Sequence, residues 1–206
     1  MKQTKKMLTL VTMIAATSLG LAAQGPGAPA PGGGQGGGAG RGRGPQGPGL
    51  TLTTTAFADG AEIPVKYTSA DPNGVSPKLE WTNVPAGTVT FALIFHDPDV
   101  ALQKNTDDVL HWMIFNIPGT AKELPEAMPP TATLPDGTIQ AKNIRGAAGY
   151  MGPGAPAPGP HHHYTFELFA LDTKLDLTPD ATRADVLKAM QGHILGKGVL
   201  VGRFHR

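Results

Sequence analysis

The sequence after residue 49 predicts an all-β domain with one late helix, folded as a two-sheet antiparallel β-sandwich. Apolar residues there recur mostly with a period of two, the spacing of a strand that buries one face. Turns rich in glycine and proline separate runs of aromatic and β-branched residues, and a helical pattern occurs only near the end. Because strands and helices do not alternate, this order argues against βαβ units.

The expected strands are of two kinds. Leu50–Ala58 alternates threonine with apolar residues, and Ile63–Tyr67 has a similar pattern, so both are expected to be half-buried strands. Nearly continuous apolar runs are typical of central strands, and they occur over Thr90–His96, His111–Ile117 and Tyr164–Leu171. A last strand is expected over Gly198–Phe204.

The helix is expected shortly before that last strand. Thr182 and Asp185 have the spacing of a capping box, in which each side chain bonds the backbone of the other. Apolar residues then follow at helical spacing: Val186, Leu187, Met190 and Ile194. Gly192 is expected to end the helix, because glycine readily adopts the left-handed conformation found there.

Residues 1–23 have the layout of a secretory signal peptide. Lys2, Lys5 and Lys6 precede an apolar stretch that ends in small residues, and cleavage is expected after Ala22 or Ala23. The alternative is an uncleaved membrane anchor, since the stretch is nearly long enough to span a bilayer. Cleavage would give an exported protein, periplasmic or extracellular, without a stable membrane span.

Residues 24–49 are expected to form a flexible linker. They hold 13 of the 28 glycines and five of the 20 prolines, and almost no apolar side chain larger than alanine. Such a segment cannot bury enough apolar surface to fold. The domain is therefore assigned to residues 50–206.

Charge and composition exclude several classes of function. All 16 acidic residues but only 12 of the 17 basic ones follow residue 50, so the expected domain has a formal charge of −4. That balance argues against nucleic-acid binding. The absence of cysteine excludes disulfides, thiol nucleophiles and cysteine-type zinc sites. No glycine pattern of the dinucleotide or P-loop type opens a helix, so no cofactor is expected.

Polar residues that could do chemistry stand where expected strands end. Asp97 directly follows a strand, and Pro98 restricts the backbone after it. His111 begins a strand, and strict alternation places it on the same face as Met113, opposite Trp112. A loop poor in side chains follows Gly152, and its backbone N–H groups could surround a small anion.

Three consecutive histidines, residues 161–163, follow that loop. In an extended chain His161 and His163 point one way and His162 the other, so the three cannot share one metal ion, and no metal site is expected. No serine stands at a strand-to-helix elbow, and no motif identifies a catalytic nucleophile. The chain is therefore not expected to be an enzyme.

Taken together, these segments resemble the phosphatidylethanolamine-binding protein family, in its bacterial branch similar to the Raf kinase inhibitor protein. The resemblance covers residues 50–206 and rests on the order and spacing of several short motifs. The motifs are Val75-Ser76-Pro77-Lys78-Leu79-Glu80-Trp81, Asp97-Pro98-Asp99, His111-Trp112, Asn116-Ile117-Pro118, Gly152-Pro153, His162-His163-Tyr164, Ala170-Leu171-Asp172 and Gly192-His193-Ile194-Leu195.

The resemblance implies a Greek-key sandwich with a small pocket at its rim for an anion, typically a phosphate-bearing head group. Carried over by motif, the ligand-binding residues would be Asp97, His111, Gly152, Pro153, His162, Tyr164 and Tyr150. The family's His-Arg-Tyr element reads His162-His163-Tyr164 here, and a shift of register would place His161 in the pocket instead of His162.

The expected function is an exported binding protein for a small anionic or phosphorylated ligand, with inhibition of a partner enzyme as one outcome of binding. Two alternatives stay open. The first is an enzyme that acts on a phosphoester with Asp97 and His111 as acid–base partners. The second is a cell-envelope scaffold that binds a protein partner through an exposed apolar patch.

Limited proteolysis of the mature protein tests the expected domain organisation. Because residues 24–49 lack core-forming side chains, we expect proteases to remove them and to leave a resistant fragment that starts near residue 50. Amino-terminal sequencing of that fragment gives the boundary. A protected fragment that retains residues 30–45 would contradict the linker assignment.

Overall fold

The structure is a computed structural model that describes residues 49–102 and 106–206. The expected signal peptide and all of the expected linker except Gly49 lie outside these residues. Among the residues described, no helix is long and apolar enough to cross a membrane.

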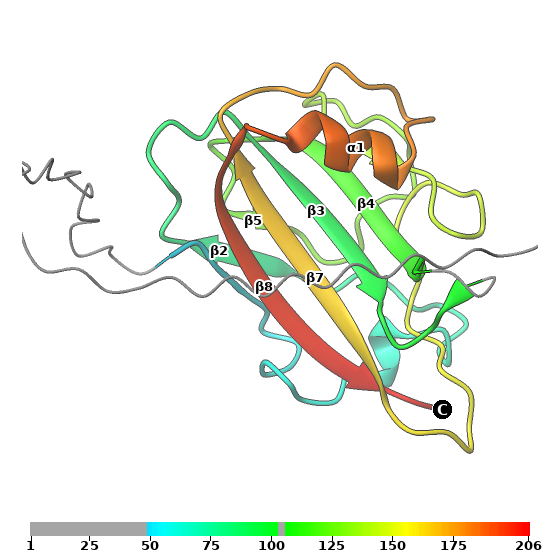
Figure 1. Ribbon diagram of the computed structural model, residues 1–206. Helices are drawn as coiled ribbons and strands as arrows, with labels where there is room; N and C mark the ends of the chain where they lie inside the picture. The colour runs from blue at the N-terminus through cyan, green and yellow to red at the C-terminus, as the bar shows by residue number, and fades with distance from the viewer. Residues whose placement is uncertain (1–48, 103–105) are drawn as a thin grey trace, which may run out of the picture. The chain divides into compact units, whose positions relative to one another are not determined.

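Two antiparallel sheets make up the described part of the chain, which confirms the predicted fold class (Figure 1). The smaller sheet has the order β1-β2-β5, with β1 at Thr51–Thr53, β2 at Leu79–Thr82 and β5 at Glu123–Leu124. The larger sheet has the order β6-β4-β3-β7-β8. Its strands are β3 at Thr90–Asp97, β4 at Val109–Pro118, β6 at Ile139–Ala141, β7 at His162–Leu171 and β8 at Ile194–Phe204.

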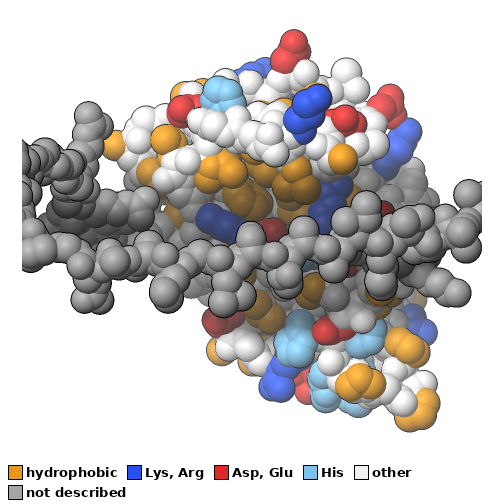
Figure 2. Space-filling view, viewed as in Figure 1, with side chains coloured by type: hydrophobic (Ala, Val, Ile, Leu, Met, Phe, Trp, Pro, Cys, Tyr) orange, Lys and Arg blue, Asp and Glu red, His pale blue; other side chains and the backbone are white. Residues whose placement is uncertain are grey.

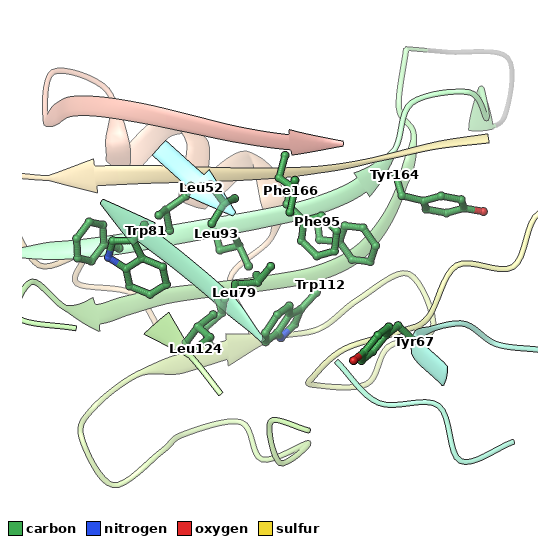
Figure 3. Close-up of a cluster of buried hydrophobic side chains, with 14 of the residues drawn as sticks. Leu52, Tyr67, Leu79, Trp81, Leu93, Phe95, Trp112, Leu124, Tyr164 and Phe166 are labelled. Carbon is green, nitrogen blue, oxygen red and sulfur yellow. The ribbon is translucent and has the colours of Figure 1, made fainter. Parts of the chain in front are cut away.

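The larger sheet buries apolar side chains on both of its faces. One face packs against the smaller sheet, and their shared cluster includes Leu52, Trp81 and Phe95 (Figure 3). The other face packs against the helix α1, Arg183–Met190, through a second cluster that includes Met113 and Val186 (Figure 1). Burial on two faces explains why β3 and β4 appear in the sequence as continuous apolar runs.

The helix begins where the capping box predicted. The side chain of Thr182 accepts a hydrogen bond from the backbone of Asp185, and the Asp185 carboxylate accepts one from the backbone of Thr182. The helix ends at Met190, and Gly192 has a positive φ of 83°. Ile194, which continued the helical spacing, instead begins β8 and is 47 % exposed.

Two of the expected strands are absent or much shorter in the structure. Ile63–Tyr67 was predicted as a strand, and that prediction is wrong: Val65–Tyr67 forms a 3₁₀-helix, η1. Pro64 has no N–H for a sheet, and its φ of −58° suits the start of a helix. Over Leu50–Ala58, only Thr51–Thr53 is a strand. The Thr54 hydroxyl accepts from the backbone N–H of Ala56 and so turns the chain out of the sheet.

Candidate functional site

A cavity of about 270 Å³ opens at the end of the larger sheet where β3 ends and β7 begins. Figure 2 shows histidine side chains gathered near the end of the molecule where β8 ends. Residues from four segments of the chain line the cavity, and those that carry polar groups or shape its wall are Asp97, His111, Arg145, Gly152, His162 and Tyr164.

A β-bulge turns His111 into this cavity. Phe95 pairs with Trp112 and His96 pairs with Leu110, so His111 is an extra residue on β4. The sequence had placed His111 on the face of Met113, and the bulge makes that prediction wrong. The His111 ring instead packs 5.3 Å from the ring of Phe95 and 5.2 Å from that of Tyr164, while Met113 belongs to the opposite cluster.

Two hydrogen bonds tie His111 to Met151, in the loop that closes the cavity. The Met151 N–H donates to the His111 carbonyl over 3.0 Å, and His111 Nδ1 lies 2.8 Å from the Met151 carbonyl oxygen. The side chain is buried, with 4 % of its surface exposed. Burial lowers the pKa of His111 below its usual value and outweighs the Met151 hydrogen bond, which acts in the other direction. His111 is therefore neutral at pH 7.

Asp97 pairs with His162 across the cavity wall. One oxygen of the buried Asp97 carboxylate lies 2.7 Å from His162 Nδ1, and the other accepts from the backbone N–H of Asp99. His162 is the first residue of β7, and 17 % of its side chain is exposed. Asp97 thus hydrogen-bonds to His162, whereas the ring of His111 bonds to a backbone carbonyl.

Tyr164 holds the loop that follows Gly152. Its hydroxyl accepts hydrogen bonds from the N–H groups of Gly154 and Ala155, over 3.2 and 2.9 Å. In Figure 3 that hydroxyl points away from the buried aromatic cluster. Burial raises the pKa of Tyr164 to about 12, and the nearby Asp97 carboxylate acts in the same direction. These two loop N–H groups are therefore engaged by Tyr164, although the sequence had suggested that they surround an anion.

The other expected site residues lie around the cavity. Gly152 lines it and packs so closely on the backbone of Thr68 that a Cβ would lie 2.7 Å from the carbonyl carbon there. Pro153 is buried behind the lining, and its carbonyl accepts from Ser69. Tyr150 stacks on Phe95 and donates its hydroxyl proton to the carbonyl of Tyr67, so it supports the wall from a neighbouring cavity.

The sequence left open whether His161 or His162 lies in the pocket, and in the structure His162 lines the cavity. His161 lies apart from it, with its ring 3.9 Å from that of His205 and its Nε2 4.0 Å from a carboxylate oxygen of Glu62. In the part of the chain that the structure describes, no group of three or more histidine, aspartate or glutamate side chains is arranged to hold a metal ion.

Sequence reasoning missed Arg145. This exposed residue lines the cavity and also a second one of about 420 Å³, which shares Met151 and Gly152 with the first. Its charge acts on His111 and helps to lower the pKa of that ring. Arg145 is the only basic residue between Lys142 and His161, a signal that the sequence offered.

Comparison with known proteins identifies the family to which this two-sheet chain belongs. The family model "Phosphatidylethanolamine-binding protein" matches residues 53–205. The chain therefore belongs to the phosphatidylethanolamine-binding protein family, as its motifs predicted.

Among the relatives of this chain are proteins of an archaeon and of a bacterium. A UPF0098 protein of Methanothermobacter thermautotrophicus is 45 % identical over 153 residues, which cover 74 % of this chain and 97 % of the relative. A UPF0098 protein of Aquifex aeolicus is 38 % identical over 152 residues, covering 73 % and 85 % of the two chains.

Solved structures agree with the fold. A family homologue from Chlamydia trachomatis has a TM-score of 0.67 at 31 % identity, covering 77 % of this chain and 98 % of that one. YbcL of E. coli, titled a member of the mammalian family, has a TM-score of 0.68 at 26 % identity, covering 77 % and 99 %.

The lowered pKa of His111 predicts a specific dependence of stability on pH. The unfolded chain takes up the proton near pH 6.5, whereas the folded chain takes it up only at lower pH. The stability due to neutral His111 is therefore complete above pH 6.5 and is lost as the pH falls from there through the folded value.

The substitution His111→Asn isolates this effect, because the asparagine amide keeps a donor for the Met151 carbonyl but does not titrate. We expect the free energy of unfolding in urea to fall less between pH 7.5 and 5.5 in this variant than in wild type. All other titrating groups are shared by the two proteins. An equal fall of the free energy of unfolding in both would therefore contradict the lowered pKa of His111.

Proposed function

We propose that this chain is an exported binding protein, periplasmic or extracellular, whose rim cavity binds a small phosphate-bearing ligand. The observation that carries the proposal is the meeting of Arg145, His111 and His162 at one cavity. A guanidinium and two imidazoles are groups that bind phosphate oxygens. The cavity volume of about 270 Å³ lies just below the usual range for drug-sized ligands, which favours a small head group.

Charge within the cavity supports the same ligand class. The Asp97 carboxylate is bonded to His162 and to the Asp99 amide, so its acceptor capacity is largely taken up by the protein. His111 adds no charge at neutral pH. The guanidinium of Arg145, in the cavity lining, is then the positive group available to a ligand. The family name refers to a phospholipid, so it supports a phosphate group in the ligand but does not distinguish a monoester from a diester.

Binding is favoured over catalysis by the arrangement of the same residues. The enzyme hypothesis uses Asp97 and His111 as acid–base partners on a phosphoester, yet Asp97 is hydrogen-bonded to His162 and the His111 ring to the Met151 carbonyl. Tyr164 also lines the cavity, but burial raises the pKa of its hydroxyl to about 12. The same hydroxyl accepts hydrogen bonds from the N–H groups of Gly154 and Ala155. It is therefore poorly suited to act as a nucleophile at neutral pH.

The substitution Arg145→Gln tests the proposed function with methyl phosphate as the probe. Removing a hydrogen bond to a charged group costs about 1.5–3 kcal/mol. Because Arg145 is exposed, we expect a loss at the low end, about tenfold in affinity. Isothermal titration calorimetry at low salt measures the change. Lys174→Gln, an exposed change outside the cavity lining, is the matched control and should bind as wild type does. Equal affinities of the folded Arg145 variant and wild type would refute this role of the cavity.

A further inference from the structure

The hydrogen bonds of His111 fix which of its ring nitrogens faces a ligand. A carbonyl oxygen can only accept, so the ring nitrogen 2.8 Å from the Met151 oxygen, Nδ1, must carry a hydrogen. In the neutral ring the lone pair then lies on Nε2. Since Nδ1 is engaged by the protein and the side chain lines the cavity, Nε2 is the nitrogen left for a ligand. Nε2 can therefore only accept a hydrogen bond. A phosphate oxygen that carries no hydrogen can also only accept, so the two cannot bond to each other.

The surroundings of His111 keep its ring neutral. The carboxylate of Asp97, at the end of β3, favours a proton on the ring, and the hydrogen bond to Met151 acts in the same direction. Arg145 from the loop after β6 and His96 from β3 oppose it, and burial opposes it most. On β7, Tyr164 packs edge-on against the ring and His162 is directed to Asp97.

We propose that the cavity binds a phosphomonoester as its monoanion, whose P–O–H group donates a hydrogen bond to Nε2 of His111. This proposal rests on the function proposed above and specifies its ligand. A monoester can present a P–O–H group to the acceptor nitrogen, while its remaining oxygens carry negative charge toward Arg145. A phosphodiester has one negative charge but no such hydrogen, so it leaves Nε2 without a partner.

The proton must be accounted for in the binding reaction. The second ionisation of a phosphomonoester lies near pH 6, so at pH 7.5 the free ligand is mainly a dianion. Binding therefore takes up a proton from solvent, and no covalent bond forms or breaks. In the complex the proton resides on the phosphoryl oxygen, because the His111 ring is buried and stays neutral. A proton on Nε2 would serve a diester as well as a monoester, so uptake with both esters would contradict the proposal.

The test is calorimetric titration of the whole protein with methyl phosphate and with dimethyl phosphate. Both are measured at pH 7.5 in two phosphate-free buffers that differ in ionisation enthalpy, which gives the number of protons taken up. We expect methyl phosphate to bind about ten- to a hundredfold more tightly. We expect the uptake of about one proton with methyl phosphate and of about none with dimethyl phosphate.

The variant His111→Asn connects the effect to its residue. It keeps a donor for the Met151 carbonyl and removes Nε2, so the preference for methyl phosphate and the proton uptake should both disappear. His193→Asn is the matched control, since His193 is exposed, pairs with Asp172 and does not line the cavity. It should behave as wild type does.

The possible results separate this proposal from the function beneath it. If both esters bind equally and without proton uptake, the cavity binds anions but the proposed proton is refuted. If proton uptake persists in the His111 variant, another group accepts the hydrogen bond of the P–O–H group and the assignment to Nε2 is wrong. If neither ester binds to wild type, the proposed function itself fails, and the specificity with it. The comparison of the two esters on wild-type protein decides the question even if the variant does not fold.

Discussion

The pair of hydrogen bonds between His111 and Met151 is the constraint on which the candidate site depends. It joins the bulge of β4 to the loop after β6, two segments 40 residues apart in the chain. The backbone bond positions the loop, and the side-chain bond determines which ring nitrogen carries a hydrogen. Tyr164 then holds the next residues of the same loop through its hydroxyl. The contact between His111 and Met151 thus determines both how the loop closes the cavity and which ring nitrogen of His111 is left for a ligand.

Local charge and overall charge differ in this protein. The residues after 50 carry a formal charge of −4. The cavity, however, is lined by the exposed Arg145, and its one carboxylate, that of Asp97, is hydrogen-bonded to His162. A small anion in the cavity interacts mainly with the nearest charged groups, because salt screens charges that lie more than about 8–10 Å away. Net charge therefore bears on nucleic-acid binding, whereas the cavity depends on Arg145, Asp97 and His162.

Features encoded by neighbouring residues could be predicted from the sequence, and features set by long-range contacts could not. The capping box of Thr182 and Asp185 is complete within four residues, and the helix begins there. The central strands were recognisable because both faces of the larger sheet are buried. By contrast, the side to which His111 points depends on its register with β3, and no local pattern reveals a bulge. The position of Arg145 depends in the same way on how its loop folds back, since Ile144 N–H donates to the carbonyl of Leu110.

The protonation of His111 at neutral pH is the most direct test of this account. Nitrogen-15 NMR of the histidine side chains distinguishes a ring nitrogen that carries hydrogen from one that does not, and comparison with His111→Asn assigns the signals. The account predicts that at pH 7, without ligand, Nδ1 of His111 carries hydrogen and Nε2 does not. A hydrogen on Nε2 at that pH, in either the other neutral form or the imidazolium, would contradict it.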